Sequence, residues 1–541
     1  YDDDLNLKEL LVGSPPGVNY HITLAYDDDG LLTAVSLPDQ GLSLDLRRDT
    51  ASGYLLGTDA HSGGSDTLRT NQWYNGFGEL AGLEALVGTT GEQLYRVIYD
   101  DGDQHPRDAL GRIVRKQETV LGESHEFTYH YDVYGRLEDV CRDGEHYSHY
   151  EYDDNGNRLL YQKCAAGVSC RPGQRCPAEI ERSGVHDEQD RLLGYGDASF
   201  AYTANGELYQ KIDEQGITTY GYDELGNLLD VWLPDGGRVH YLVDGRNRRI
   251  GRQVFSPGGT LTAEQGFIYL DQLNPVAELD GEGNIVSVFV YATRPNVPDL
   301  MYSCKDPAAP VAPCDPGAPW RSYRVVSDHL GSVRLVVSLD DATFGEVVQR
   351  MDYDEYGVVL TDTAPGFQPF GFAGGMYDID TNTLRLGIRD YKPILGRWFS
   401  KDVFIFIINS LHSYVYALND PVNFLDLFGL QPIQPVPGKG VRLFDFDLGH
   451  LGKFTFRLNL SGPLGPPLDP RALSEYQQIN LNNFLNNIPC DRILSPLPKI
   501  YRPIKLPELK LDDIKSSINK YFTNINVLEI TFPDLTLKFS Y

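Results

Sequence analysis

The fold class can be inferred from the stretch "HEFTYHYDVYGRLEDV", His125–Val140. Aromatic and β-branched residues alternate with polar ones on either side of a central Asp-x-x-Gly, which is the period-two pattern of β-strands. Asp and Gly are turn residues, because Asp accepts hydrogen bonds from the backbone that follows it and Gly adopts positive φ without steric cost. The stretch therefore predicts a β-hairpin with a Tyr just before its turn.

This hairpin pattern recurs along most of the chain. Copies begin at Tyr26, Tyr131, Tyr152, Tyr202, Tyr222 and Tyr353, and degenerate copies begin at Asp108 and Tyr241. One hairpin cannot bury a face by itself, so many hairpins must pair side by side into one long curved sheet. We therefore predict a mainly β fold, and we interpret the Tyr, Asp and Gly of the repeat as structural residues.

Three segments follow the repeats in a fixed order. They are "YRVVSDHLGSVRLV" (Tyr323–Val336), "PFGFAGGMYDIDTNTLRLGIRDYKPILGRWFSKD" (Pro369–Asp402) and "SYVYALNDPVNFLDLFGL" (Ser413–Leu430). Together with the hairpins, they make residues 20–430 resemble the Rhs/YD-repeat proteins and their C-terminal Rhs core module. The resemblance implies a spiralling, hollow β-shell with a variable C-terminal cargo, commonly a toxin, held inside. It also implies that the core module cuts the chain after Leu430.

The expected organisation has three parts. Residues 1–322 form the YD-repeat shell, truncated at its N-terminal end, residues 323–430 form the core module, and residues 431–541 form a small α+β cargo domain. The net charge also changes sign at residue 430. The last 111 residues carry 13 Lys and Arg against 10 Asp and Glu, within a chain of net charge −29. A large acidic surface also keeps a β protein soluble.

Self-cleavage without a metal or a Ser or Cys nucleophile requires two carboxylates close enough to share a proton. By position in the family motif these are Asp402 and Asp426, and Arg389 matches the arginine associated with cleavage. The family usually has Pro after each aspartate, whereas Val403 and Leu427 stand here. The alternative is that Arg389 and the two aspartates are buried salt-bridge partners in a plug that closes the shell. Asp390 is a nearby carboxylate outside the motif position.

Cysteine spacing favours loop disulfides over a zinc site, because the gaps are too long for Cys-x-x-Cys chemistry. Cys164, Cys170 and Cys176 share one loop-like stretch, and Cys304 and Cys314 flank another, whereas Cys141 and Cys490 have no obvious partner. Such disulfides suit a protein that leaves the cytoplasm. We predict no metal and no cofactor.

The C-terminal part is predicted from its patterning. A hairpin is expected over residues 441–460, helices over 469–488 and 511–522, and strands over 527–541. It shows none of the zinc-protease, phosphate-loop or serine-hydrolase motifs. Asp445, Asp447 and His450 are interpreted as a solvated strand face rather than a metal site, and the basic residues of 499–510 are weak evidence for nucleic acid.

The apolar run from Asp402 to Leu411 is too short to span a membrane and is expected to be a buried strand. The resemblance implies a protein made in the bacterial cytoplasm and then secreted or delivered by a type VI or toxin-complex machine, with an immunity protein as a further partner. It points to a role in bacterial competition. The alternative is a surface YD-repeat protein that adheres or binds carbohydrate through rows of exposed Tyr.

Overall fold

The computed structural model describes residues 6–13, 19–64, 66–102, 107–315, 317, 319–402, 413–430, 444–447, 453–457, 527–532 and 535–540. The chain divides into two compact units, Tyr1–Val441 and Arg442–Tyr541. Among the described residues, no helix is long and apolar enough to cross a membrane.

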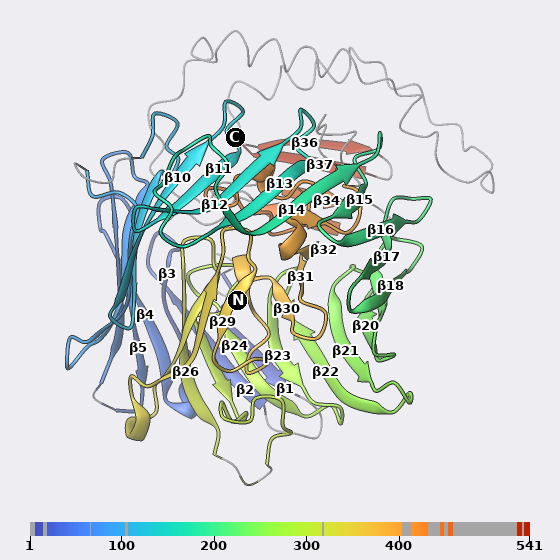
Figure 1. Cartoon of the computed structure of the whole chain (residues 1–541). Helices are drawn as coiled ribbons and strands as arrows, with labels where there is room; N and C mark the ends of the chain where they lie inside the picture. The colour runs from blue at the N-terminus through green and yellow to red at the C-terminus, as the bar shows by residue number, and fades with distance from the viewer. Residues whose placement is uncertain are drawn as a thin grey trace. The chain divides into compact units, whose positions relative to one another are not determined.

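The first unit contains a 29-stranded sheet in which every strand pairs antiparallel with the next one in sequence (Figure 1). This continuous meander confirms the predicted mainly β fold built from hairpins. Its strands are β1 Glu9–Gly13, β2 Asn19–Tyr26, β3 Leu32–Leu37, β4 Leu42–Arg48, β5 Leu55–Ser62, β6 Leu68–Tyr74, β7 Leu80–Val87, β8 Gln93–Ile98, β9 Arg115–Val120, β10 Glu123–Tyr131, β11 Leu137–Arg142, β12 Glu145–Tyr152, β13 Arg158–Cys164, β14 Ala178–His186, β15 Leu192–Tyr195, β16 Ala198–Tyr202, β17 Leu208–Asp213, β18 Gly216–Tyr222, β19 Leu228–Trp232, β20 Arg238–Val243, β21 Arg249–Phe255, β22 Leu261–Tyr269, β23 Pro275–Leu279, β24 Ile285–Val290, β25 Leu300–Ser303, β26 Arg321–Ser327, β27 Val333–Ser338, β28 Val347–Tyr353 and β29 Val359–Asp362.

The Asp of the repeat caps its own turn. Between β10 and β11, Oδ1 of Asp132 accepts hydrogen bonds from the backbone N–H groups of Tyr134 and Arg136, both at 2.9 Å. Gly135 has φ of 84°, which a side chain would strain. The same pair of backbone contacts recurs in other turns, at Asp27, Asp108, Asp153, Asp223 and Asp354.

In several repeats the Tyr ties its hairpin to the one before it. The Tyr222 hydroxyl donates to the carbonyl oxygen of Leu208, one hairpin earlier, at 2.7 Å. Equivalent bonds join Tyr26 to Leu7, Tyr131 to Ile113 and Tyr152 to Leu137. These rings lie between hairpins rather than in rows on an outer face. They therefore do not support the alternative of carbohydrate binding through rows of exposed Tyr.

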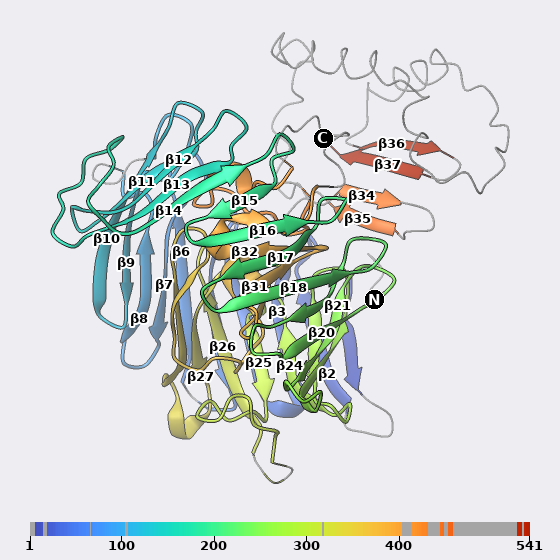
Figure 2. The same ribbon diagram turned by 45° about the vertical axis from the view of Figure 1, so that its right-hand side comes forward.

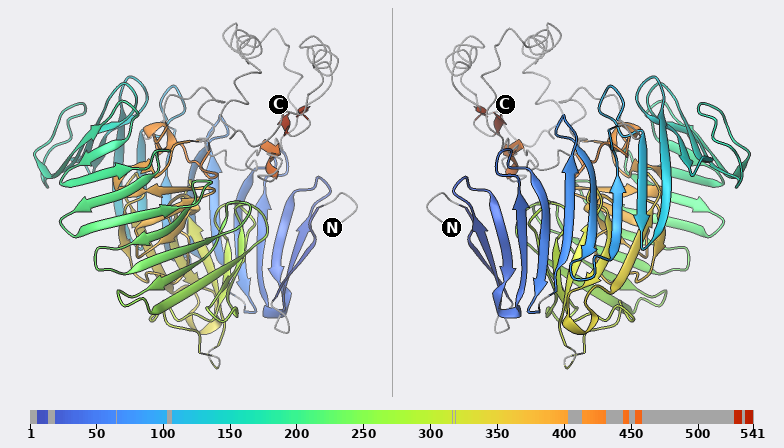
Figure 3. Two further views of the ribbon diagram at one scale, coloured as in Figure 1. Left: turned by 90° about the vertical axis from the view of Figure 1, so that its right-hand side faces the viewer. Right: turned by 90° about the vertical axis from the view of Figure 1, so that its left-hand side faces the viewer.

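The sheet curls so that its early strands face its late ones (Figure 3). Tyr20 on β2 packs against Tyr302 on β25, with ring centroids 6.2 Å apart. Arg334 on β27 forms an ion pair with Glu118 on β9 at 3.4 Å. One apolar core therefore joins residues of β1–β12 to residues of β23–β27.

A second, four-stranded sheet packs against the inner side of the curl. It consists of β30 Met376–Asp378, β31 Thr383–Leu386, β32 Arg389–Lys392 and β33 Arg397–Trp398. Short 3₁₀ turns accompany the two sheets at η1 Pro38–Gln40, η2 Asp341–Thr343, η3 Phe372–Gly374, η4 Pro393–Leu395 and η5 Ala417–Asn419. We call residues 363–402 and 413–430 the plug.

The strands of the plug lie beside the wall strands (Figure 2), and polar contacts join the two. Tyr241 on β20 donates to Asp378 at 3.0 Å, and Asn423 accepts from the backbone of Ile113 at 2.7 Å. Leu208 on β17 donates its N–H to the Phe399 carbonyl at 2.9 Å. The plug therefore contacts strands that are far apart in the sequence.

The second unit contains β34 Phe444–Asp447, β35 Lys453–Arg457, β36 Val527–Phe532 and β37 Leu535–Ser540. They form one antiparallel sheet in the order β35-β34-β37-β36. The hairpin predicted over 441–460 and the strand patterning predicted over 527–541 are thus present. The two predicted helices and the strand expected after Asp402 lie outside the described residues.

Candidate active site

Arg389, Asp402 and Asp426 meet inside the plug. Nη2 of Arg389, at the start of β32, lies 3.0 Å from Oδ2 of Asp402 and 3.3 Å from Oδ2 of Asp426. All three residues are buried, and Asp426 is only 1% exposed. Both carboxylates thus lie within hydrogen-bonding distance of the same nitrogen, although they are separated by more than twenty residues of chain.

Leu430 is held against the same trio. Its backbone N–H donates to Oδ1 of Asp426 at 2.9 Å. Nε of Arg389 donates to the carbonyl oxygen of Gly429, so the peptide group between Gly429 and Leu430 is contacted at both its oxygen and its nitrogen. The carbonyl carbon of Leu430 is two covalent bonds from the nitrogen that Asp426 binds.

The turn between β31 and β32 positions these groups. Gly387 has φ of 57°, and a Cβ there would lie 2.2 Å from the Phe428 carbonyl oxygen. The neighbouring Ile388 N–H donates to that same oxygen at 3.0 Å. The closing segment can approach β32 this closely because residue 387 carries no side chain.

The surroundings of the trio are aromatic and buried. The Arg389 guanidinium stacks over the Trp398 ring, 4.1 Å from its centroid, which holds the side chain in place. Burial, together with the negative charge of Asp426, raises the pKa of Tyr416 far above its usual range. Within the trio one guanidinium group faces two carboxylates, so the three side chains form a single buried ionic cluster.

Asp390, the neighbouring alternative carboxylate, belongs to a separate cluster. It accepts from Arg249 at 2.6 Å and from Arg385 at 2.7 Å, and all three side chains are buried. These two ion pairs fasten β32 to β21 and β31. The structure therefore assigns Asp390 a role in attaching the plug to the wall.

Three disulfides are formed in the first unit. They are Cys164–Cys176, Cys304–Cys314 and Cys141–Cys170. Sequence reasoning left Cys141 without a partner, because it lies on β11 rather than in a loop. Once Cys164 and Cys176 pair, Cys170 is the odd member of its stretch, and Cys141 is the preceding cysteine in the sequence. Cys490 lies outside the described residues.

Groups that could ligate a metal gather near β11 and β12. Oδ1 of Asp139 accepts from Nε2 of His146 at 2.8 Å and from Nδ1 of His149 at 2.6 Å. These hydrogen bonds account for the arrangement, and they lower the pKa of Asp139 against the opposing effect of its burial. Of the C-terminal residues interpreted as a solvated strand face rather than a metal site, Asp445 and Asp447 lie on β34, and His450 lies outside the described residues.

Known proteins share this architecture. The family model described as teneurin YD-shell matches residues 65–422. Mouse (Mus musculus) teneurin-4 is 26% identical over 330 residues, which cover 58% of this chain and 10% of that protein. Toxin protein Tse5 of Pseudomonas aeruginosa is 25% identical over 364 residues, 60% of this chain and 26% of Tse5.

Among solved structures, the TcdB2–TccC3–Cdc42 complex aligns with a TM-score of 0.54 at 17% identity, covering 76% of this chain and 22% of the matched chain. At that identity the likeness concerns the fold. The chain spans about a tenth of the length of the curated teneurins that it matches and about a quarter of Tse5. Since the YD-shell model covers well over half of the sequence, the chain belongs to the YD-shell family, as an Rhs/YD-repeat protein.

Proposed function

We propose that the chain is an Rhs-type toxin shell that cuts itself after Leu430 and frees residues 431–541 as its cargo. The observation that carries this proposal is the hydrogen bond from the Leu430 amide to Asp426, made within the trio of Arg389, Asp402 and Asp426. A plug that needed salt bridges alone would not require a carboxylate on the backbone at the end of the shell.

The chemistry is hydrolysis of the peptide bond between Leu430 and Gln431. The ionised carboxylate of the pair takes a proton from a water molecule, whose oxygen attacks the Leu430 carbonyl carbon. The protonated carboxylate gives its proton to the Gln431 nitrogen as the C–N bond breaks. The products are a carboxyl group on Leu430 and an amine on Gln431, and the two aspartates have exchanged protonation states.

Arg389 supports this reaction in two ways. Its guanidinium favours the ionised form of one carboxylate, and its Nε–H fixes the peptide group beside the bond to be cut. Because the substrate is part of the same chain, the effective concentration of the bond at the site is very high, and a modest catalyst suffices for a single turnover.

One of the two departures from the family pattern lies among the described residues and is compatible with this geometry. Leu427 stands where the family has Pro, and its side chain is 3% exposed within the apolar core of the plug. That packing holds the backbone that carries Asp426. Val403, the other departure, lies outside the described residues.

The cargo and its delivery are inferred from relatives. Tse5 is named a toxin protein, and TccC3 is bound to TcdB2 in a solved complex of similar fold. We infer that residues 431–541 are an effector held within the shell until delivery. The route would be a type VI or toxin-complex machine carrying the protein out of the producing bacterium, where an immunity protein would neutralise the effector.

The test of self-cleavage is direct. The purified chain is denatured and run on a gel, and N-terminal sequencing is applied to the smaller band. We expect a fragment that begins at Gln431, lost in Asp402→Asn and in Asp426→Asn. A single 60.6 kDa band from the wild-type chain would refute the proposal.

A matched control is Asp280→Asn, which neutralises a partly exposed hairpin aspartate far from the plug in sequence. It should leave cleavage intact. Circular dichroism on each variant separates loss of chemistry from loss of the fold. A harmless 431–541 fragment expressed by itself, together with an uncut chain, would favour an adhesive role instead.

A further inference from the structure

Two buried arginines stand apart from the others. Seven arginines are buried among the described residues, and five of them form ion pairs with carboxylates, namely Arg249, Arg324, Arg334, Arg385 and Arg389. Arg158 and Arg397 form none with any described residue. A buried charge without a compensating partner costs several kcal/mol, so two such charges require an explanation.

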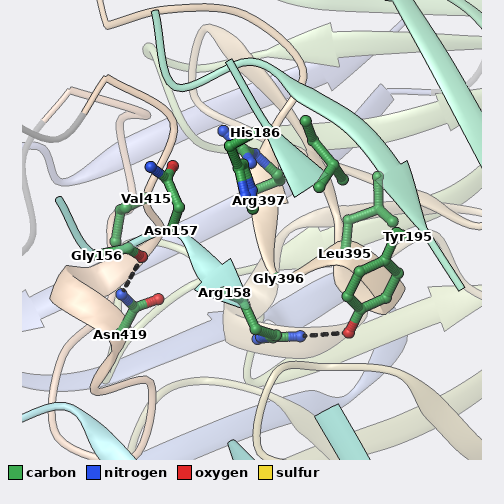
Figure 4. Close-up of a pocket in the computed structure, with 11 residues that line it drawn as sticks. Gly156, Asn157, Arg158, His186, Tyr195, Leu395, Gly396, Arg397, Val415 and Asn419 are labelled. Carbon is green, nitrogen blue, oxygen red and sulfur yellow. Dashed lines mark hydrogen bonds between the residues drawn. The ribbon is translucent and has the colours of Figure 1, made fainter. Parts of the chain in front are cut away.

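Both of these arginines line the same small cavity (Figure 4). Arg158 begins β13 in the wall, and Arg397 begins β33 in the plug. Between them lies Gly396, where a Cβ would be 2.1 Å from Nη2 of Arg158. The cavity volume is about 10 Å³, roughly the space for one water-sized particle.

Hydrogen-bond donors around this cavity lack acceptors. Nε and Nη2 of Arg158 and Nε of Arg397 are buried and make no hydrogen bond. The faces of the two guanidinium groups are covered by tyrosines, Tyr356 at 3.9 Å from Arg158 and Tyr414 at 4.9 Å from Arg397. Stacking of this kind stabilises the charge but leaves the N–H groups at the edges unsatisfied.

His186 is the third nitrogen-bearing group on the cavity. Both of its ring nitrogens are buried without a partner. Burial and the positive charge of Arg397 lower the pKa of His186 to about 4, so the ring is neutral at ordinary pH and can offer one N–H. Two cations and a neutral imidazole thus surround the same space.

The nearest acidic residues are engaged elsewhere. Asp190 approaches Arg397 with its backbone carbonyl oxygen, while its carboxylate accepts from Asn157 at 2.7 Å. The carboxylate of Asp153 also accepts from Asn157, at 2.9 Å. These two carboxylates are therefore hydrogen-bonded to an amide donor and not to Arg158 or Arg397.

We infer that this cavity binds one small monovalent anion, of the size class of chloride, between Arg158 and Arg397. Its size does not suit a phosphate or a ligand-borne carboxylate without displacement of its walls. The anion would join the wall hairpin at β13 to the plug at η4 and β33. It would therefore strengthen the attachment of the plug independently of any cleavage.

The test uses bromide, which replaces chloride and scatters anomalously. Crystals of the full chain soaked in sodium bromide should show an anomalous peak in contact with both guanidinium groups. A cavity occupied by water, with no bromide peak at saturating salt, would overturn the inference. This measurement needs no variant and so does not depend on a variant's folding.

Thermal unfolding gives a second readout. At equal ionic strength, bromide should raise the wild-type Tm by about 2 °C over isethionate, which is too large for the cavity. Arg397→Gln should abolish that difference, whereas Arg238→Gln, which removes a half-exposed surface charge, should retain it. Equal Tm values in the two salts for the wild type would contradict anion binding.

Discussion

The Leu430 amide nitrogen donates to Oδ1 of Asp426 at 2.9 Å, which ties the last residue of the plug to a buried carboxylate four residues earlier. The other oxygen of that carboxylate lies 3.3 Å from Nη2 of Arg389, which also contacts Asp402. One short loop of chain thus presents its own backbone to a buried carboxylate that shares Arg389 with Asp402.

Arg389→Lys should slow cleavage by about 100-fold, because an ammonium group keeps the charge but cannot contact the carboxylates and the Gly429 carbonyl together from one planar group. The measurement is the time course of fragment formation after synthesis in vitro. Arg249→Lys is the matched control, since Arg249 is also buried, paired with an aspartate and stacked on an aromatic ring. Equal slowing in both variants would indicate a structural effect alone.

Gly387→Ala should block cleavage while the sheet of β1–β29 stays folded. The new Cβ would meet the Phe428 carbonyl oxygen at 2.2 Å and push the closing segment away from β32. Gly283→Ala is the control, because Gly283 also has positive φ, 82°, but nothing lies within 4 Å of its Cβ position. Gel analysis and circular dichroism report the two outcomes, and an uninhibited Gly387→Ala chain would show that this close approach is dispensable.

Tyr222→Phe should lower the free energy of unfolding by about 1–2 kcal/mol. The change leaves the Leu208 carbonyl oxygen without its hydroxyl donor while it keeps the ring. Tyr209→Phe is the comparison, since Tyr209 is 47% exposed and its change should be nearly neutral. Urea denaturation followed by tryptophan fluorescence measures both. A loss in Tyr209→Phe as large as that in Tyr222→Phe would argue against the hairpin-to-hairpin bond.

Stability should depend on pH through Glu355. Burial, and next the charge of Asp354, raise the pKa of Glu355 to about 7 from an unfolded value of 4.5. The folded protein holds this proton more tightly, so the contribution to stability is complete below pH 4.5 and is lost as the pH rises through 7. Glu355→Gln, which stays neutral, should remove that loss, about 3 kcal/mol at pH 8.

Urea denaturation at pH 5 and pH 8 measures how much the free energy of unfolding changes with pH. Glu282→Gln, an exposed glutamate in a hairpin turn, should leave the pH dependence as in the wild type. A smaller pH dependence of the free energy of unfolding is expected to remain in Glu355→Gln, because burial also raises the pKa of Asp354 to about 6. Identical pH dependence in Glu355→Gln and the wild type would contradict the assignment.

Local patterning was sufficient for the hairpins and their turns. In "YDVYGRL" the Asp132 carboxylate finds its hydrogen-bond partners within four residues, so sequence spacing alone specifies the contact. The Tyr131 hydroxyl, by contrast, reaches Ile113 in the preceding hairpin. That bond depends on the stacking of neighbours, and periodicity could indicate the Tyr but not its acceptor.

Cys141 shows the same limit. Its partner Cys170 is 29 residues away, across a hairpin and a loop, and spacing cannot identify such a pair. For Asp402 and Asp426 it was the resemblance to the Rhs core module, rather than the residues themselves, that singled them out. Their meeting at Arg389 depends on the plug folding back between strands of the wall.

The amino-acid sequence was sufficient to predict the strand periodicity and the turns, because each of these depends on residues that are close along the chain. The folded chain was needed to identify the carboxylates that share Arg389, the buried arginines that lack an acidic partner among the described residues and the glycine that leaves room for Phe428. These depend on contacts between segments far apart in the sequence, and such contacts exist only once the sheet has curled around the plug.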